Sequence, residues 1–224
     1  MNLSIIIPTL NEVETIGKTL ETLKARPAEI IVVDGGSRDG TVDVAREYTP
    51  HVLLSRTGRG LQQNKGACQA QGDVLVFLHA DTRLPSAYGH LIHRALADPR
   101  VVFGAFSLSI DPREPAFDLI ALMANLRSRF LRLPYGDQGI FVRRTAYFKA
   151  GGFQDWPIME DVDLVRRLKQ VGGFKLARGF VQTSARRWQK ERLICTTVRN
   201  WSLILRYYMG VSPHTLARHY PDAR

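Results

Sequence analysis

Runs of apolar residues alternate with helical patterns through the first hundred residues of the chain. In GDVLVFLHADT, residues 72–82, five consecutive apolar residues from Val74 to Leu78 lead directly into polar residues. Such a run, bounded by turn residues, is typical of a strand buried on both faces, as in a parallel sheet covered by helices. Because ligands bind at the carboxyl ends of such strands, we expect His79 and Asp81 at the mouth of a site. A simple turn or cap role for Asp81 is the alternative.

The same alternation predicts repeated βα units at the start of the chain. The first strand is LSIIIP, and Asn11 with Glu14 then indicates a helix N-cap before apolar residues at helical spacing. Strands that alternate with helices build a parallel sheet. Further strands are expected over residues 29–34, 51–55 and 73–78, with helices through residues 42–45 and 60–71.

Beyond residue 100 the elements become longer and less regular. This part contains too little regular structure to bury a separate core, so we expect it to extend the same sheet with mixed strand directions. The predicted fold class is α/β: a single Rossmann-like domain over residues 1–190, with a mixed sheet flanked by helices, followed by an amphipathic helix and tail over residues 191–224. The predicted elements are strands at 101–110, 138–144 and 174–183 and helices at about 116–131 and 159–168.

Composition agrees with an ordinary globular protein. The 224 residues are 45% hydrophobic and 23% charged, which disfavours disorder. Cys68 and Cys195 are too few for a disulfide framework and lack metal-motif spacing, which indicates a reducing compartment. The first residues, MNLSIIIPTLNE, lack the basic region of a signal peptide. We therefore expect a cytoplasmic protein.

The net charge of +10 is concentrated in the second half of the chain. Residues 1–111 hold 11 Lys and Arg against 12 Asp and Glu, whereas residues 112–224 hold 20 against 9. A basic half could face nucleic acid, an anionic membrane or a phosphorylated substrate, and charge alone does not choose. The longest apolar run there, Leu119–Ala124, is too short to span a bilayer. We expect no nucleic-acid partner, because the basic residues form no RNP, zinc-finger or basic-zipper pattern.

Two nucleotide-binding classes are disfavoured by the turns. Asp34 ends the second strand, where dinucleotide-binding folds place the acid that bonds ribose. However, the turn after the first strand reads PTLNE without a glycine fingerprint, and no P-loop pattern occurs, which disfavours NAD enzymes and NTP hydrolases. A nucleotide held near Thr9, Glu12 and Asp34 remains, although each of these alone is more often a turn or cap residue.

Four segments in order resemble the family 2 glycosyltransferases of the GT-A fold. They are SIIIPTLNE, IIVVDGGSRDGT, GRGLQQNKGACQAQGDVLVFLHADT and MEDVDLVRRL, and the resemblance covers roughly residues 2–190. It implies an inverting enzyme that moves a sugar from a UDP- or GDP-sugar to a small or lipid-linked hydroxyl acceptor. The wording LPYGDQGIFVRR, GGFQDWPIMED and TSARRW is similar to a short subgroup described as arsenosugar-biosynthesis-type or radical-SAM/selenodomain-associated transferases.

The resemblance implies a metal and donor site. In this family the acids after the strand bind a divalent ion that bridges the donor's diphosphate, so Asp81 is the expected ligand of Mn²⁺ or Mg²⁺. His79 stands where the family pattern has its first acid: as a ligand it would favour Mn²⁺, and a neutral histidine bonded to the backbone is the alternative. The expected donor-binding residues are Pro8, Thr9, Glu12, Asp34, Arg59, Gln63 and Asp81.

The resemblance also implies a catalytic base. An inverting transfer needs a group that takes the proton of the attacking hydroxyl, and Asp161 matches the family's base, with Glu160 beside it. Alternatively, these acids and Asp163 only complement a helix N-terminus. SARRW resembles the end of the Q-x-x-R-W motif of processive relatives, but its glutamine is missing, which favours one sugar per turnover. The expected acceptor or diphosphate residues are Asp137, Gln138, Arg186, Arg187 and Trp188.

The segment ERLICTTVRNWSLILRYYMG, residues 191–210, mixes aromatic and basic residues in a helical pattern. Such a helix suits the surface of an anionic bilayer, which would place the protein at the inner face of the membrane. Packing on the domain and contact with a second copy in a homodimer are the alternatives. The alternative function is a catalytically idle sugar-nucleotide-binding protein that acts through partners, but the presence of both Asp81 and Asp161 favours the enzyme.

Overall fold

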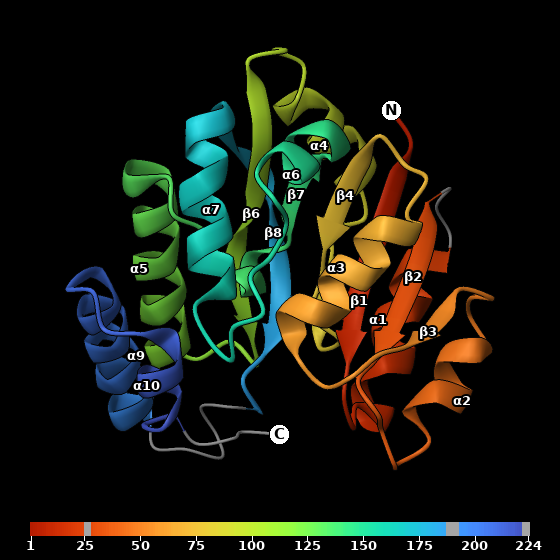
Figure 1. Ribbon diagram of the computed structural model, residues 1–224, viewed down its shortest axis with the longest axis horizontal. Coiled ribbons are helices and arrows are strands. Elements are labelled where there is room, and N and C mark those ends of the chain that lie inside the picture. Colours follow the sequence, from red (N-terminus) through yellow and green to blue (C-terminus); the bar gives the residue numbers. More distant parts are fainter. Residues whose placement is uncertain (25–27, 187–192, 221–224) are drawn as a thin grey trace.

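In the part of the chain that the structure describes, eight strands form one mixed sheet in the order β3-β2-β1-β4-β7-β6-β8-β5 (Figure 1). The computed structural model describes residues 1–24, 28–186 and 193–220. The first four strands run parallel, β7 is antiparallel to both β4 and β6, and β6 is parallel to β8. The predicted α/β class and mixed sheet are confirmed. The strands are β1 (Leu3–Thr9), β2 (Glu29–Asp34), β3 (Val52–Leu54), β4 (Val74–Phe77), β5 (Thr82–Arg83), β6 (Val101–Asp111), β7 (Ile140–Arg143) and β8 (Gly173–Ser184).

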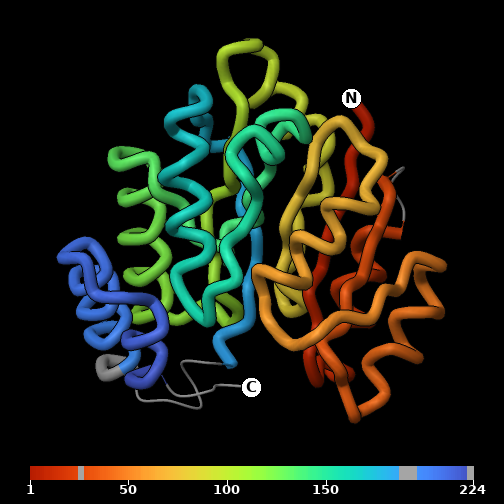
Figure 2. The backbone as a smooth tube through the Cα atoms, in the orientation of Figure 1, coloured from red at the N-terminus to blue at the C-terminus, as the bar shows by residue number. Residues whose placement is uncertain are grey.

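The helices cover the sheet in two layers, each with its own apolar core. Helices α1, α2, α4 and α5 contribute to one core, and α3, α6 and α7 contribute to the other, in front of the sheet in Figure 2. Helices α9 and α10 lie at the periphery of the molecule, next to α5 and α7 (Figure 1). The helices are α1 (Val13–Lys24), α2 (Thr41–Arg46), α3 (Arg59–Gln69), α4 (Tyr88–Ala95), α5 (Pro115–Leu131), α6 (Arg144–Lys149), α7 (Glu160–Val171), α9 (Leu193–Tyr208) and α10 (Pro213–Ala217).

Burial on both faces explains the uninterrupted apolar strands. Ile5 and Ile7 of β1 point into one core, and Ile6 points into the other. All four residues of β4 are buried in the same way. Side chains alternate across a strand, so a strand with a core on each side needs apolar residues at every position.

The start of α1 differs from the prediction. Asn11 has a positive φ of 53°, and its side chain accepts a backbone N–H from the turn after β2 instead of capping the helix. The backbone N–H groups of Glu12 and Val13 donate to Thr41 Oγ1 at 2.8 Å and to Asp39 Oδ2 at 3.1 Å. The caps therefore come from a turn nearly thirty residues away, which local spacing does not reveal.

Helices α9 and α10 pack on the segment that precedes α7. Leu203 and Leu216 form a small core with Ile158. The predicted boundary at residue 190 falls within residues 187–192, outside the described part of the chain. None of the described helices has both the length and the apolar composition needed to cross a bilayer.

We predict that Gly66→Ala lowers the free energy of unfolding by about 1–3 kcal/mol, because an added methyl group would overpack the contact between α3 and β1. A Cβ at Gly66 would lie 2.5 Å from Ile6 Cγ2, whereas one at Gly89 in α4 would meet only Leu3 Cδ1 at 3.9 Å. Urea denaturation measures both variants. Gly89→Ala is the control and should be neutral or slightly stabilising, and a Gly66→Ala variant as stable as this control would contradict the packing.

Candidate active site

A cavity of about 290 Å³ lies where the carboxyl ends of β1 and β4 meet the start of α7. Asp81 comes from the end of β4 and Asp161 from the first turn of α7, so segments eighty residues apart bring both acids to one cavity. This is the edge at which open α/β sheets bind ligands. The predicted residues in its wall are Pro8, Thr9, Glu12, Arg59, His79, Asp81, Asp137, Glu160, Asp161 and Arg186.

A buried ion pair joins the first residues of two helices beside the cavity. Arg59 begins α3, and its Nε lies 3.2 Å from Oε1 of Glu160, the first residue of α7. The Glu160 side chain is only 2% exposed, and its charge raises the pKa of Arg59. Glu160 therefore neutralises a buried arginine, whereas Asp161 occupies the cavity wall without such an ion pair among the described contacts.

Two backbone groups fix the orientation of the Asp161 carboxylate. Gly136 N–H donates to Oδ2 at 2.7 Å, and Val162 N–H donates to Oδ1 at 2.8 Å. A Cβ at Gly136 would lie 2.9 Å from His79 Nε2 and 3.3 Å from Asp161 Oδ2. Gly136 thus fills the narrow space between His79 and Asp161, and a larger residue there would displace one of them.

Asp81 and Glu12 are close to each other in the wall of the cavity. Burial, and then the charge of Glu12, raise the pKa of Asp81, and Arg186 opposes the shift. Arg186 Nη2 lies 2.6 Å from Glu12 Oε2, which ties the end of β8 to the turn after β1. A cation that binds beside Asp81 would relieve the repulsion between the two acids.

The residues present fit a divalent ion that is shared with a ligand. Within residues 1–24, 28–186 and 193–220, no group of three His, Cys, Asp or Glu residues is placed to hold a metal by itself. Mg²⁺ and similar hard ions are commonly held by one or two carboxylates together with substrate phosphates and water. Asp81 offers such a carboxylate in the cavity wall, and His79 lines the same cavity.

Gln138 does not line the cavity, contrary to the expectation for this residue. Its side chain is fully buried, and Oε1 accepts bonds from Ser128 Oγ at 2.7 Å and from Arg127 Nη2 at 3.0 Å. Its Nε2 donates to the carbonyl oxygen of Phe106 at 3.1 Å. Gln138 therefore holds the loop that carries Gly136 against α5 and β6.

Two further predicted donor contacts lie behind the cavity wall. Asp34 is 1% exposed, and Oδ1 accepts the backbone N–H groups of Gly36 and Ser37 at 2.8 Å, which shapes the turn after β2. Gln63 is also buried and lines a smaller void next to Arg59. Direct contact of either residue with a donor stays a prediction. Arg187 and Trp188 lie outside the described residues.

Several residues of the site were not predicted from the sequence. Gln62 Nε2 donates to the carbonyl oxygens of Thr9 and Val33, both at 2.8 Å, and so fixes α3 to the ends of β1 and β2. Asn200 and Leu203 of α9 line the cavity. Gln62 lies between Gly60 and Gly66, and glycines in a helix indicate that another segment packs closely against it, which is a partial indication for Gln62. No motif indicated that one face of α9 would line the cavity.

Sequence comparison relates the chain to known transferases. The family described as Glycosyl transferase family 2 matches residues 4–153, well over half of the chain. Glycosyltransferase AglE of Haloferax volcanii is 36% identical over 90 residues, which cover 35% of this chain and 30% of AglE. The matched segments span only 30–37% of the first curated relatives.

Solved structures share the fold at low sequence identity. S. aureus TarS 1–349 in complex with UDP-GlcNAc superposes with a TM-score of 0.66 at 16% identity, over 82% of this chain and 58% of that one. The mannosyltransferase PcManGT of Pyrobaculum calidifontis, in complex with GDP-Man and Mn²⁺, gives a TM-score of 0.62 at 21% identity, over 81% and 56%. With the match over residues 4–153, the chain belongs to glycosyl transferase family 2.

Proposed function

We propose that the chain is an inverting, divalent-metal-dependent glycosyltransferase that moves a sugar from a UDP- or GDP-sugar to a hydroxyl acceptor. The observation that carries the proposal is the meeting of Asp81 and Asp161 in one cavity. TarS and PcManGT, which share the fold, are complexed with UDP-GlcNAc and with GDP-Man and Mn²⁺. Membership of the arsenosugar-biosynthesis-type or radical-SAM/selenodomain-associated subgroup stays a prediction.

Asp161 is proposed as the base. Its oxygens accept one backbone N–H each, which fixes the carboxylate and leaves further lone pairs for a substrate proton. As the acceptor oxygen bonds to the anomeric carbon, its proton passes to Asp161, and the bond from that carbon to the diphosphate oxygen breaks with its electron pair on the diphosphate. Attack opposite the departing group inverts the anomeric configuration.

The charge of the cavity supports a metal requirement. A sugar-nucleotide diphosphate is an anion, yet acids outnumber arginines in the described wall, so an anion alone would meet net repulsion. A divalent ion held by Asp81, with His79 as the proposed second ligand, would neutralise charge that develops on the departing diphosphate. The charged wall residues are Glu12, Asp81, Asp137, Glu160 and Asp161 against Arg59 and Arg186.

Arg186 is proposed to bind the diphosphate of the donor in place of its present partner, the Glu12 carboxylate. It is paired with Glu12 and is close enough to Asp81 to oppose the rise in that residue's pKa. Phosphate oxygens accept from a guanidinium as carboxylate oxygens do, so donor binding would replace Glu12 as the partner. Asp137 lines the same cavity and is proposed for the acceptor side.

Asp161→Asn is expected to keep donor binding and lose transfer by about 10²–10⁴-fold, because an amide has no basic oxygen for the acceptor proton. Calorimetry with a UDP- or GDP-sugar measures binding, and nucleotide diphosphate released in the presence of an acceptor alcohol measures transfer. Asp155→Asn, at an exposed position outside the cavity wall, is the control. Transfer by the Asp161→Asn variant at the control's rate would remove Asp161 from the base role.

The same assays test the alternative function. Tight donor binding by the unaltered chain without transfer to any alcohol would favour a catalytically idle sugar-nucleotide-binding protein.

Asp81→Asn is expected to abolish the part of donor binding that depends on Mn²⁺ or Mg²⁺, because an amide oxygen is a weaker ligand than a carboxylate. Thermal shift with the donor, with and without each ion, measures this part as the extra stabilisation that the ion adds. Asp43→Asn, on the exposed face of α2, makes the same change of charge away from the cavity. An undiminished ion effect in the Asp81→Asn variant would contradict its role as a ligand.

Gly136→Ala is expected to lower kcat by about tenfold or more, because the new methyl group would displace Asp161, the proposed base, or His79, the proposed second metal ligand. A displaced His79 would also raise the donor Kd. Steady-state kinetics and calorimetry separate the two effects. Gly89→Ala serves again as the control, and unchanged kcat in Gly136→Ala would show that the space is larger than the geometry indicates.

A further inference from the structure

Helix α5 is apolar on two faces, although only one of them is buried. Its inner face packs into the core through Phe117, Ala121 and Ala124. On the outer face, Leu119 and Leu122 are exposed at 60% and 52%, and the exposed apolar positions continue along the helix at 123, 126 and 130. These positions recur every three or four residues, so they form one continuous stripe. Monomeric proteins rarely expose an apolar stripe of this length without a partner.

Helix α9 carries a second exposed stripe. Val198, Trp201, Leu205 and Tyr208 follow one another at helical spacing and are all more than half exposed. The opposite face of α9 buries Leu203 and lines the active-site cavity. The helix is therefore anchored from one side and leaves an aromatic and aliphatic face uncovered on the other.

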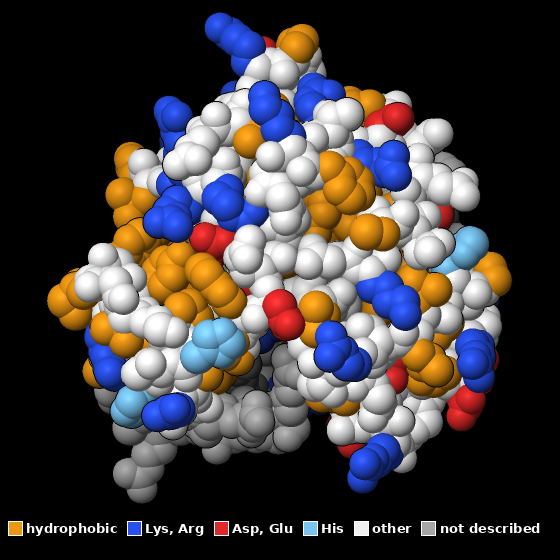
Figure 3. All heavy atoms as spheres, viewed as in Figure 1, with side chains coloured by type: hydrophobic (Ala, Val, Ile, Leu, Met, Phe, Trp, Pro, Cys, Tyr) orange, Lys and Arg blue, Asp and Glu red, His pale blue; other side chains and the backbone are white. Residues whose placement is uncertain are grey.

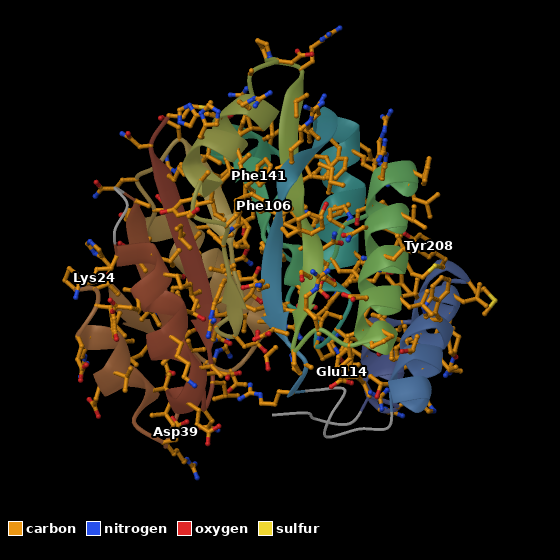
Figure 4. All side chains as sticks on the ribbon, turned by 180° about the vertical axis from the view of Figure 1, so that it is seen from behind. Lys24, Asp39, Phe106, Glu114, Phe141 and Tyr208 are labelled. Atoms are coloured by element: carbon orange, nitrogen blue, oxygen red, sulfur yellow. The ribbon has the colours of Figure 1, made fainter. Side chains whose placement is uncertain are left out.

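The two stripes lie on the same side of the molecule. Figure 1 shows α9 beside the half of α5 in which that helix begins, and Figure 4 shows Tyr208 next to α5. Burial raises the pKa of Tyr208, and Arg166 of α7 and Arg127 of α5 are close enough to oppose the shift. Apolar side chains also gather over this side in Figure 3. We call the two exposed stripes together the α5–α9 surface.

The charge around the α5–α9 surface is mainly positive, and the acids Glu114 and Asp118 are confined to the start of α5. Residues 119–136 and residues 193–220 contain no acid, but they include four arginines that are at least partly exposed, at 129, 132, 206 and 218. The acids of α5 stand at its start, where Asp118 is paired with Arg113. In a symmetric dimer this surface would meet its own copy, so most of its arginines would face arginines, with acids only at the start of α5 to pair with them. An anionic bilayer supplies both the apolar phase and the opposite charge.

We propose that the α5–α9 surface seats the protein on an anionic lipid bilayer, with its apolar stripes in the interface and its arginines among the headgroups. The test is flotation of the full chain at low salt with vesicles of phosphatidylcholine that contain phosphatidylglycerol, against vesicles of phosphatidylcholine alone. We expect binding to the anionic vesicles and its loss when salt is raised. The assay needs no donor or acceptor, so its outcome is independent of the proposed transfer.

Matched variants locate the surface. Leu119→Glu and Leu205→Glu are each expected to lower the vesicle partition coefficient about tenfold or more, because each replaces a leucine that would be buried in the bilayer interface by a charged side chain. Leu54→Glu on β3 makes the same change of charge at a leucine of equal exposure, 59% against 60% and 62%, and should bind as the unaltered chain does. Circular dichroism melting confirms that all three remain folded.

Three results would overturn the proposal: no flotation of the unaltered chain with anionic vesicles, equal flotation with both kinds of vesicle at all salt concentrations, or an equal loss in Leu54→Glu. Sedimentation without lipid tests the alternative that a second copy of the chain covers the α5–α9 surface. A concentration-dependent dimer that Leu119→Glu and Leu205→Glu dissociate, together with absent vesicle binding, would assign the surface to a second copy of the chain.

Discussion

Helix α3 is bonded on one side to the ends of β1 and β2 and on the other side to α7 and the segment before it, and the active-site cavity depends on this connection. On one side, Gln62 fixes α3 to the ends of β1 and β2. On the other side, the Asn64 side chain donates to the carbonyl oxygen of Phe153 at 2.8 Å and accepts its N–H at 2.9 Å. The ion pair of Arg59 with Glu160 completes the link. Removing one partner of such a buried pair typically costs about 3–5 kcal/mol, because the other charge would stay buried without compensation.

This connection determines the position of Asp161, the proposed base. Glu160 and Asp161 are adjacent in sequence, and the pairing of Glu160 with Arg59 fixes the first turn of α7. Asp161 then meets Gly136 on a loop that Gln138 holds against α5. Backbone hydrogen bonds therefore orient the Asp161 carboxylate, whereas the Glu160 carboxylate is paired with Arg59.

The sequence predicted the strands well because their burial leaves an unambiguous pattern. Residues in β1, β2 and β4 are apolar at nearly every position, which only a sheet with two covered faces requires. The two residues of β5 gave no such pattern, and they pair with β8 a hundred residues later. The acids that follow strands were also predictable, because strand ends converge at one edge of a sheet.

The partners of polar side chains were less predictable, because a short motif does not record which distant group completes a hydrogen bond. Gln138 and Asp137 are neighbours, yet Gln138 is buried in the contact with α5 and Asp137 lines the cavity.

The net charge of the second half did not show where in the fold its basic residues lie. In the described wall, the basic half of the chain contributes three acids, Asp137, Glu160 and Asp161, but only one arginine, Arg186. The basic excess of that half therefore lies outside the described wall of the cavity. The described wall thus leaves the charge of the proposed donor to a cation bound with it. Exposed arginines such as Arg129 and Arg218 lie away from this wall, where we propose that they meet an anionic bilayer.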